Sequence, residues 1–221
     1  MTLTRTVLVT SGLALALICG ATQAQPAAQG GKPMMTLQMP VTPDPARVTL
    51  DPKTTALIVL DYVEDICAKQ PTCTGQMLPA MTPFLERVRK AGLVVAYGTR
   101  ERNKTHWLKE VAPAPGDIQI ISTAQDRFYN TDLDKVLKAK GIKTLIMVGW
   151  KISGSVTYTS VGAMIRDYTV VVPVDTTSAG SSYETTIGFY NVLNSGTANL
   201  ANDPLKPKAV TLTRTDMITF Q

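Results

Sequence analysis

Residues 54–61 read Thr-Thr-Ala-Leu-Ile-Val-Leu-Asp, and this stretch decides the fold class. The continuous apolar run from Ala56 to Leu60 is typical of a strand that is buried on both faces of a sheet. The run ends at a carboxylate, Asp61. Because open parallel sheets bind ligands just beyond the carboxyl ends of their strands, Asp61 is a candidate site residue.

The rest of the chain repeats this kind of strand and places helices between the repeats. Apolar runs predict further strands at residues 93–97, 118–121, 144–148, 169–174 and 209–212. Helical spacing of apolar residues, with start and stop signals, predicts helices at residues 78–88, 132–140, 155–167 and 182–193. We therefore predict an α/β fold, a three-layer Rossmann-like arrangement in which helices cover both faces of a six-stranded, mostly parallel sheet.

The composition excludes several classes of protein. The 221 residues, 44% of them hydrophobic, suit one folded domain and not a disordered tail. The net charge of +5 is modest and the basic residues are spread along the chain, so neither nucleic acid nor an anionic membrane is an expected partner. The single histidine, His106, excludes a zinc site with several imidazoles and is expected in an exposed loop. We expect no metal and no cofactor.

Residues 1–24 have the layout of a secretory signal peptide. Arg5 precedes an apolar stretch that is too short to span a bilayer comfortably, and small residues precede a cut near Ala24. An uncleaved N-terminal anchor is one alternative, and a lipoprotein cut at Cys19 is another, which bulky Ile18 before the cysteine disfavours. Residues 25–53 carry six prolines, which disfavour a regular helix or a central strand and predict an arm ahead of a domain at residues 54–221. The protein is then expected to be periplasmic or secreted, with no membrane contact after signal removal.

Export would also decide the state of the cysteines. Of the three in the chain, removal of the signal peptide leaves Cys67 and Cys73. In an oxidising compartment this pair is expected to form a disulfide that closes a small loop. A free thiol nucleophile and a metal-binding pair are the alternatives.

Three segments of the predicted domain resemble the isochorismatase-like (cysteine hydrolase) superfamily. Residues 54–65 resemble its opening strand, in which Asp61 stands at the first aspartate of a D-x-x-N-D pattern. Residues 128–133, Phe-Tyr-Asn-Thr-Asp-Leu, resemble its F-x-x-T-x-L segment. Residues 149–163 resemble its G-x-x-T-x-x-C-V-x-x-T-x-x-x-A block. The resemblance covers about residues 54–179.

The resemblance implies hydrolase chemistry. In that family a cysteine at a helix N-terminus attacks an amide or nitrile carbon, an aspartate takes the proton of the thiol, and a lysine supports the developing charge. Backbone N–H groups before the helix form an oxyanion hole. Some members that cleave vinyl ethers lack the cysteine and use the aspartate as an acid.

This chain departs from the family pattern at two of the three catalytic positions. Asp61 matches the aspartate, but Ser155 stands at the cysteine position and Ser122 at the lysine position. These three residues are the expected catalytic set. A serine hydroxyl needs a base beside it, and either Asp61 or Lys151 is a candidate for that role. The residues expected to bind the substrate, some of them as replacement cations, are Lys151, Ile152, Arg127, Phe128 and Arg100.

The same residues have purely structural interpretations, so three functions stay open. Asp61 can anchor a loop, Ser155 can begin a helix, and Lys151 and Arg127 can be solvated charges. The first function is an exported hydrolase of a small amide, ester or vinyl ether. The second is a catalytically inactive protein that binds a small anionic ligand. The third is assembly, in which the proline-rich arm contacts a neighbouring subunit of a homo-oligomer.

Overall fold

The computed structural model describes residue 36 and residues 38–100 and 106–221. The predicted signal peptide, residues 1–24, lies outside the described residues. The chain divides into two units, Met1–Met39 and Pro40–Gln221, and the helices and strands described below lie in the second unit. Within the described part of the chain, no helix is both long enough and apolar enough to cross a bilayer.

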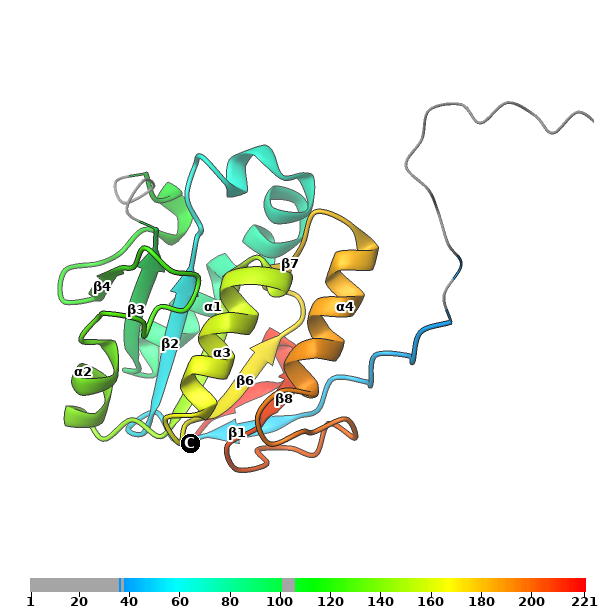
Figure 1. The fold of residues 1–221 in the computed structure, drawn as a ribbon. Coiled ribbons are helices and arrows are strands. Elements are labelled where there is room, and N and C mark those ends of the chain that lie inside the picture. The colour runs from blue at the N-terminus through cyan, green and yellow to red at the C-terminus, as the bar shows by residue number, and fades with distance from the viewer. Residues whose placement is uncertain (1–35, 37, 101–105) are drawn as a thin grey trace, which may run out of the picture. The chain divides into compact units, whose positions relative to one another are not determined.

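A parallel sheet forms the centre of the second unit, with the strand order β4-β3-β2-β5-β6-β8 (Figure 1). The short strand β7 (Thr177–Ser178) pairs with the end of β5, also in parallel. The predicted α/β fold with a mostly parallel sheet is therefore confirmed. The six main strands are β2 (Thr55–Leu60), β3 (Val94–Thr99), β4 (Ile118–Ile121), β5 (Thr144–Trp150), β6 (Thr169–Pro173) and β8 (Val210–Thr213).

Helices cover both faces of this sheet. Successive residues of a strand point to opposite sides, so the fully buried strand β2 presents apolar side chains to both faces. In β2, Leu57 and Val59 pack in the apolar cluster that contains α1 (Leu78–Lys90). Ala56, Ile58 and Leu60 pack in the other cluster, on the face that carries the remaining helices (Figure 1). These helices are α2 (Leu133–Ala139), α3 (Thr157–Met164) and α4 (Ser182–Leu193).

A second, two-stranded sheet pairs β1 (Val48–Leu50) with β9 (Ile218–Phe220) in parallel. β1 lies within the segment that we predicted as a proline-rich arm. Val48 and Leu50 are buried in the cluster that contains α1, so the compact unit begins before residue 54. Since β1 pairs with β9 and not with the central sheet, the prolines that flank it do not interrupt a central ladder.

The two central strands, β2 and β5, approach each other closely at their carboxyl ends. Gly149 has a φ of +136°, and a Cβ added there would overlap with the carbonyl oxygen of Leu60 and lie 2.7 Å from its carbonyl carbon. Only glycine fits this position. The approach brings together the residues that follow the two strands.

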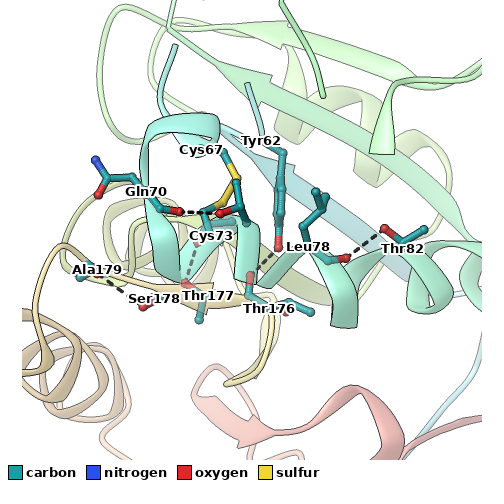
Figure 2. The surroundings of a disulfide bond; sticks show 12 residues. Tyr62, Cys67, Gln70, Cys73, Leu78, Thr82, Thr176, Thr177, Ser178 and Ala179 are labelled. Carbon is teal, nitrogen blue, oxygen red and sulfur yellow. Dashed lines mark hydrogen bonds between the residues drawn. A yellow bond between two sulfur atoms is a disulfide. The ribbon is translucent and has the colours of Figure 1, made fainter. Parts of the chain in front are cut away.

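Cys67 and Cys73 form a disulfide, as predicted, with their Cα atoms 5.3 Å apart (Figure 2). Both residues are fully buried, on two short helical turns between β2 and α1 (Cys67–Lys69 and Cys73–Met77). Because the two sulfur atoms are bonded to each other, neither cysteine is a free nucleophile.

Candidate active site

Asp61 lies directly after β2, where the strand order reverses between β2 and β5. Such a reversal is the place where open parallel sheets bind ligands. The backbone of Asp61 has a φ of +56°, and its N–H donates to the carbonyl oxygen of Gly98 at 3.1 Å. The residue is 2% exposed, and its Oδ1 accepts a hydrogen bond from the Thr99 hydroxyl at 3.1 Å.

Arg127 places a guanidinium against this carboxylate. Its Nη2 donates to both carboxylate oxygens of Asp61, at 2.9 and 2.7 Å, and to Oγ of Ser155 at 3.2 Å. The side chain of Arg127 is fully buried. Burial lowers the pKa of Arg127 from its ordinary value, and the neighbouring Asp61 opposes that shift. Asp61, Arg127 and Ser155 therefore form one buried cluster, the Asp–Arg–Ser cluster.

Gly98 in β3 makes room for the guanidinium stem. A Cβ added to Gly98 would lie 2.8 Å from Cγ of Arg127 and 3.0 Å from Cδ2 of Leu60. The long side chain of Arg127 can thus cross the end of β3 to reach Asp61 only because this strand residue has no side chain.

The loop that carries Arg127 is docked onto α3. The Thr159 hydroxyl donates to the carbonyl oxygen of Gln125 at 3.2 Å and accepts the backbone N–H of Arg127 at 3.3 Å. Asp126 accepts the N–H of Phe128 at 2.9 Å. Burial raises the pKa of Asp126, and this hydrogen bond opposes the shift. Contacts on both sides of Arg127 therefore fix its backbone.

Ser155 lies in a π-helical turn, Ile152–Val156, between β5 and α3. We predicted a helix beginning at Ser155, whereas the regular helix begins at Thr157. The carbonyl oxygen of Lys151 accepts the N–H groups of Gly154 and Val156, at 2.9 and 3.3 Å, which closes the turn. The N-terminal end of a helix carries partial positive charge, so this turn favours negative charge developing near Ser155.

A cavity of about 210 Å³ opens beside the Asp–Arg–Ser cluster. A small ligand in it can reach Asp61 and Ser155, while Arg127 lies buried behind them. The lining residues are Asp61, Ile66, Arg100, Gln125, Trp150, Lys151, Gly154 and Ser155.

Three cations and two carboxylates surround this cavity. Asp61 is paired with Arg127, and Lys151 is paired with Glu184 at 2.6 Å. The hydrogen bond from Lys151 lowers the pKa of Glu184. Arg100 forms no ion pair with any residue that the structure describes, and it lines the cavity.

Residues 55–200 match the family model of the isochorismatase domain. The chain belongs to the isochorismatase family. The ureidoacrylate amidohydrolase RutB of Caulobacter segnis is 26% identical over 205 residues, which cover 71% of this chain and 85% of the relative.

Solved structures of the isochorismatase family share the fold. N-carbamoylsarcosine amidase from Thermoplasma acidophilum superposes with a TM-score of 0.59 at 22% identity, over 74% of this chain and 97% of the other. An isochorismatase from Pseudomonas putida KT2440 gives a TM-score of 0.64 at 16% identity, over 77% and 93%.

Ser122, which we predicted at the family's lysine position, does not join the Asp–Arg–Ser cluster. Its hydroxyl donates to the carbonyl oxygens of Asp126 and Tyr129, at 3.1 and 3.3 Å, and accepts the N–H of Ala124 at 3.2 Å. Ser122 therefore closes the turn that leads to Arg127. The cation beside Asp61 comes from Arg127, one of the replacement cations that the sequence left open.

Two of the predicted substrate-binding residues lie in the core and do not line the cavity. Ile152 is fully buried and packs against Gly188 of α4, where an added Cβ would lie 2.7 Å from its Cγ2. Phe128 stacks on Tyr168, with ring centroids 5.9 Å apart. Both side chains are apolar and are buried in the same core cluster.

Lys151 and Arg100 do line the cavity, as the sequence predicts. Lys151 forms no hydrogen bond with Ser155 within the described residues, because its Nζ is directed to Glu184. The sequence reasoning missed Ile66, Gln125 and Trp150. Trp150 is the last residue of β5, a strand that we did predict. Its position at the carboxyl end of that strand could have indicated that it lines the cavity.

His106 is 54% exposed, and its Nδ1 lies 3.5 Å from Asp65. The described residues include no group of three or more His, Cys, Asp or Glu side chains that could hold a metal ion.

Proposed function

We propose that the protein is an exported hydrolase of small acyl compounds. In this proposal Asp61 keeps the role of the family's aspartate, Arg127 takes that of the lysine and Ser155 takes that of the cysteine. One observation carries the proposal. A single atom, Nη2 of Arg127, lies within hydrogen-bond distance of both Asp61 and Ser155. A carboxylate, a fixed cation and a hydroxyl therefore meet at one end of a cavity of ligand size.

In this proposal the Ser155 hydroxyl attacks the acyl carbon and passes its proton to Asp61. The bond from Oγ to carbon forms, and the carbonyl oxygen becomes an oxyanion near the N-terminal end of α3. Asp61 returns the proton to the leaving group, which departs and leaves an acyl-serine. Water then hydrolyses this acyl-serine with Asp61 again acting as the base. Arg127 keeps its proton throughout and stabilises negative charge on Asp61 and Ser155.

The proposed substrate class follows from how the leaving group obtains a proton. Asp61 must take up this proton from Ser155 while both of its oxygens are engaged by Arg127, which makes it a weak proton carrier. An amine cannot leave without that proton, whereas an activated alkoxide or phenoxide can. The site offers one carboxylate, and the chain's single histidine, His106, is exposed and paired with Asp65. The relatives named above are an amidohydrolase and an amidase. For this chain we propose activated esters ahead of amides.

Export and oligomeric state are also parts of the proposal. The residue order in 1–24 supports a signal peptide, and a buried disulfide is typical of proteins that fold in an oxidising compartment. The expected homo-oligomer stays a prediction, which light scattering on the purified chain would test.

The hydrolase proposal is tested on p-nitrophenyl acetate and on the matching amide, p-nitroacetanilide. We expect turnover of the ester, and a fall in kcat/KM of about 100-fold or more in both Ser155→Ala and Asp61→Asn. Ser153→Ala removes a hydroxyl from the same turn without touching the cluster, and it should keep the parent rate. Equal ester rates in the parent, Ser155→Ala and Asp61→Asn would place any hydrolysis outside this cluster and reject the proposal.

A second candidate function is binding of a small carboxylate without turnover. It is favoured by one observation, namely that both oxygens of Asp61 already accept hydrogen bonds from Arg127. A base engaged in this way must give up part of an ion pair in order to take a proton. Saturable binding of benzoate in calorimetry, lost in Lys151→Ala and kept in Lys135→Ala, with no ester turnover, would favour this function.

A further inference from the structure

The disulfide closes a loop that begins close to the candidate site. Ile66 follows Asp61 by five residues in the sequence and immediately precedes Cys67. Ile66 lines the cavity together with Asp61 and Trp150. The residue that forms part of the cavity wall is thus the direct neighbour of a half-cystine.

Hydrogen bonds and packing fix one side of this loop. The carbonyl oxygen of Val63 accepts the N–H groups of Ile66 and Cys67, at 3.1 and 2.8 Å. Tyr62 is fully buried, and its hydroxyl donates to the carbonyl oxygen of Thr176 at 2.9 Å (Figure 2).

The other side of the loop is held by the disulfide and by the carbonyl oxygen of Gln70, which accepts the N–H groups of Cys73 and Thr74 at 2.9 and 3.1 Å. The N–H groups of Lys69 and Gln70 are satisfied inside the loop, by the carbonyl oxygens of Ile66 and Cys67. Cys73 packs in the core with Met77 and Tyr62. The disulfide therefore connects the short turn that carries Ile66 to the buried start of the α1 segment, whereas the exposed residues Ala68 and Lys69 between them contribute little packing.

We propose that the Cys67–Cys73 disulfide is a positioning device for the cavity wall, which holds Ile66 in place beside Trp150. Reduction by a dithiol transfers two electrons and two protons to the disulfide, breaks the S–S bond and leaves two cysteine thiols and an oxidised dithiol. The turn with Ile66 then loses its cross-link to the turn Cys73–Met77 that precedes α1, and Trp150 becomes more accessible from the cavity. The inference concerns the same cavity as the proposed function, but it does not require that the cavity catalyses anything.

Trp150 itself supplies the measurement. The chain has two tryptophans, Trp107 and Trp150, so Trp107→Phe leaves Trp150 as the only one. Trp107 packs edge-on against Tyr97, a contact that phenylalanine can retain. Acrylamide quenching of the Trp150 fluorescence then reports how well the cavity wall covers this side chain.

In the full-length Trp107→Phe protein, reduction with dithiothreitol is expected to raise the acrylamide quenching constant by about twofold or more, with an unchanged far-ultraviolet circular dichroism spectrum. Ile66→Ala in the oxidised protein should give a similar rise, and reduction of Ile66→Ala should add little to it. Lys69→Ala changes an exposed residue of the same loop and should leave the quenching constant unchanged.

The outcome that overturns the proposal is equal quenching in oxidised and reduced protein once thiol titration shows that both cysteines are free. A rise on reduction that Ile66→Ala does not share would also overturn it, because the disulfide would then act through another residue. If reduction unfolds the chain, Cys67→Ala/Cys73→Ala and Ile66→Ala are compared at a lower temperature at which both are folded. Failure of ester hydrolysis leaves all of these readings intact, so the two proposals fail separately.

Discussion

Arg127→Met is expected to lower the free energy of unfolding by about 3–5 kcal/mol, because it removes one partner of a buried ion pair and leaves the other charge unpaired. Asp61 is 2% exposed, and without the guanidinium its partner among the described side chains is the Thr99 hydroxyl. Methionine fills much of the space of the arginine stem and so limits the contribution of a cavity. Urea unfolding, followed by circular dichroism, measures the change.

Arg214→Met is the matched control for this loss. Arg214 pairs with Asp216 at 3.1 Å, but its side chain is 45% exposed, so the same substitution should cost less than about 1 kcal/mol. The double variant Asp61→Asn/Arg127→Met should lose less than the sum of the two single variants, since neither charge is then left alone. A loss for Arg127→Met no larger than that for Arg214→Met would mean that Asp61 is solvated in solution.

Gly149→Ala is expected to cost about 4 kcal/mol or more, or to prevent folding, since it combines two separate penalties. The φ of +136° is one that residues with a Cβ rarely adopt, and the added Cβ would overlap with the backbone of Leu60. Neither β2 nor β5 can move away without breaking the ladder at the centre of the sheet. The yield of soluble protein and urea unfolding measure the effect.

Gly92→Ala separates the two penalties. Gly92 also has a positive φ, +78°, but an added Cβ there would have no neighbour within 4 Å. Its cost should therefore be that of the backbone conformation alone, about 1–3 kcal/mol. If Gly149→Ala lost no more stability than Gly92→Ala, the close approach of β2 and β5 would not exist in solution.

The central sheet was predictable because its strands are continuous apolar runs with no competing signal. The run at residues 56–60 alone places β2 in the interior, and the order of strands and helices then fixes a parallel sheet. β7 escaped prediction since Thr177 and Ser178 carry no apolar pattern, and only their pairing with Gly149 and Trp150 defines a strand. The start of α3 was misplaced because serine at residue 155 is as suitable for a first helical turn as for the turn before it.

The candidate site was predictable in part, since its polar residues follow strand ends. Asp61 was found in this way, and Ser155, Lys151 and Arg100 were found through the resemblance to the family. The sequence named Arg127 among the possible replacement cations but could not choose between them. The position of a charge depends on the length of the side chain and on the path of the loop, and not only on the position along the chain. Gly98 leaves space for the long side chain of Arg127. The sequence alone does not indicate this role, because it does not show that β3 and the Arg127 loop are adjacent.

The ladder between β1 and β9 has a mechanical consequence. The two strands run parallel, from Val48 beside Ile218 to Leu50 beside Phe220, and the N–H of Gln221 donates to the carbonyl oxygen of Leu50 at 3.1 Å. A force that pulls apart the two ends of this unit therefore acts along the strands and loads their hydrogen bonds together in shear. An antiparallel terminal pair would instead open like a zipper, one bond after another. The two-stranded sheet of β1 and β9 thus gives the unit mechanical resistance to a force applied at its ends, and so protects the central sheet.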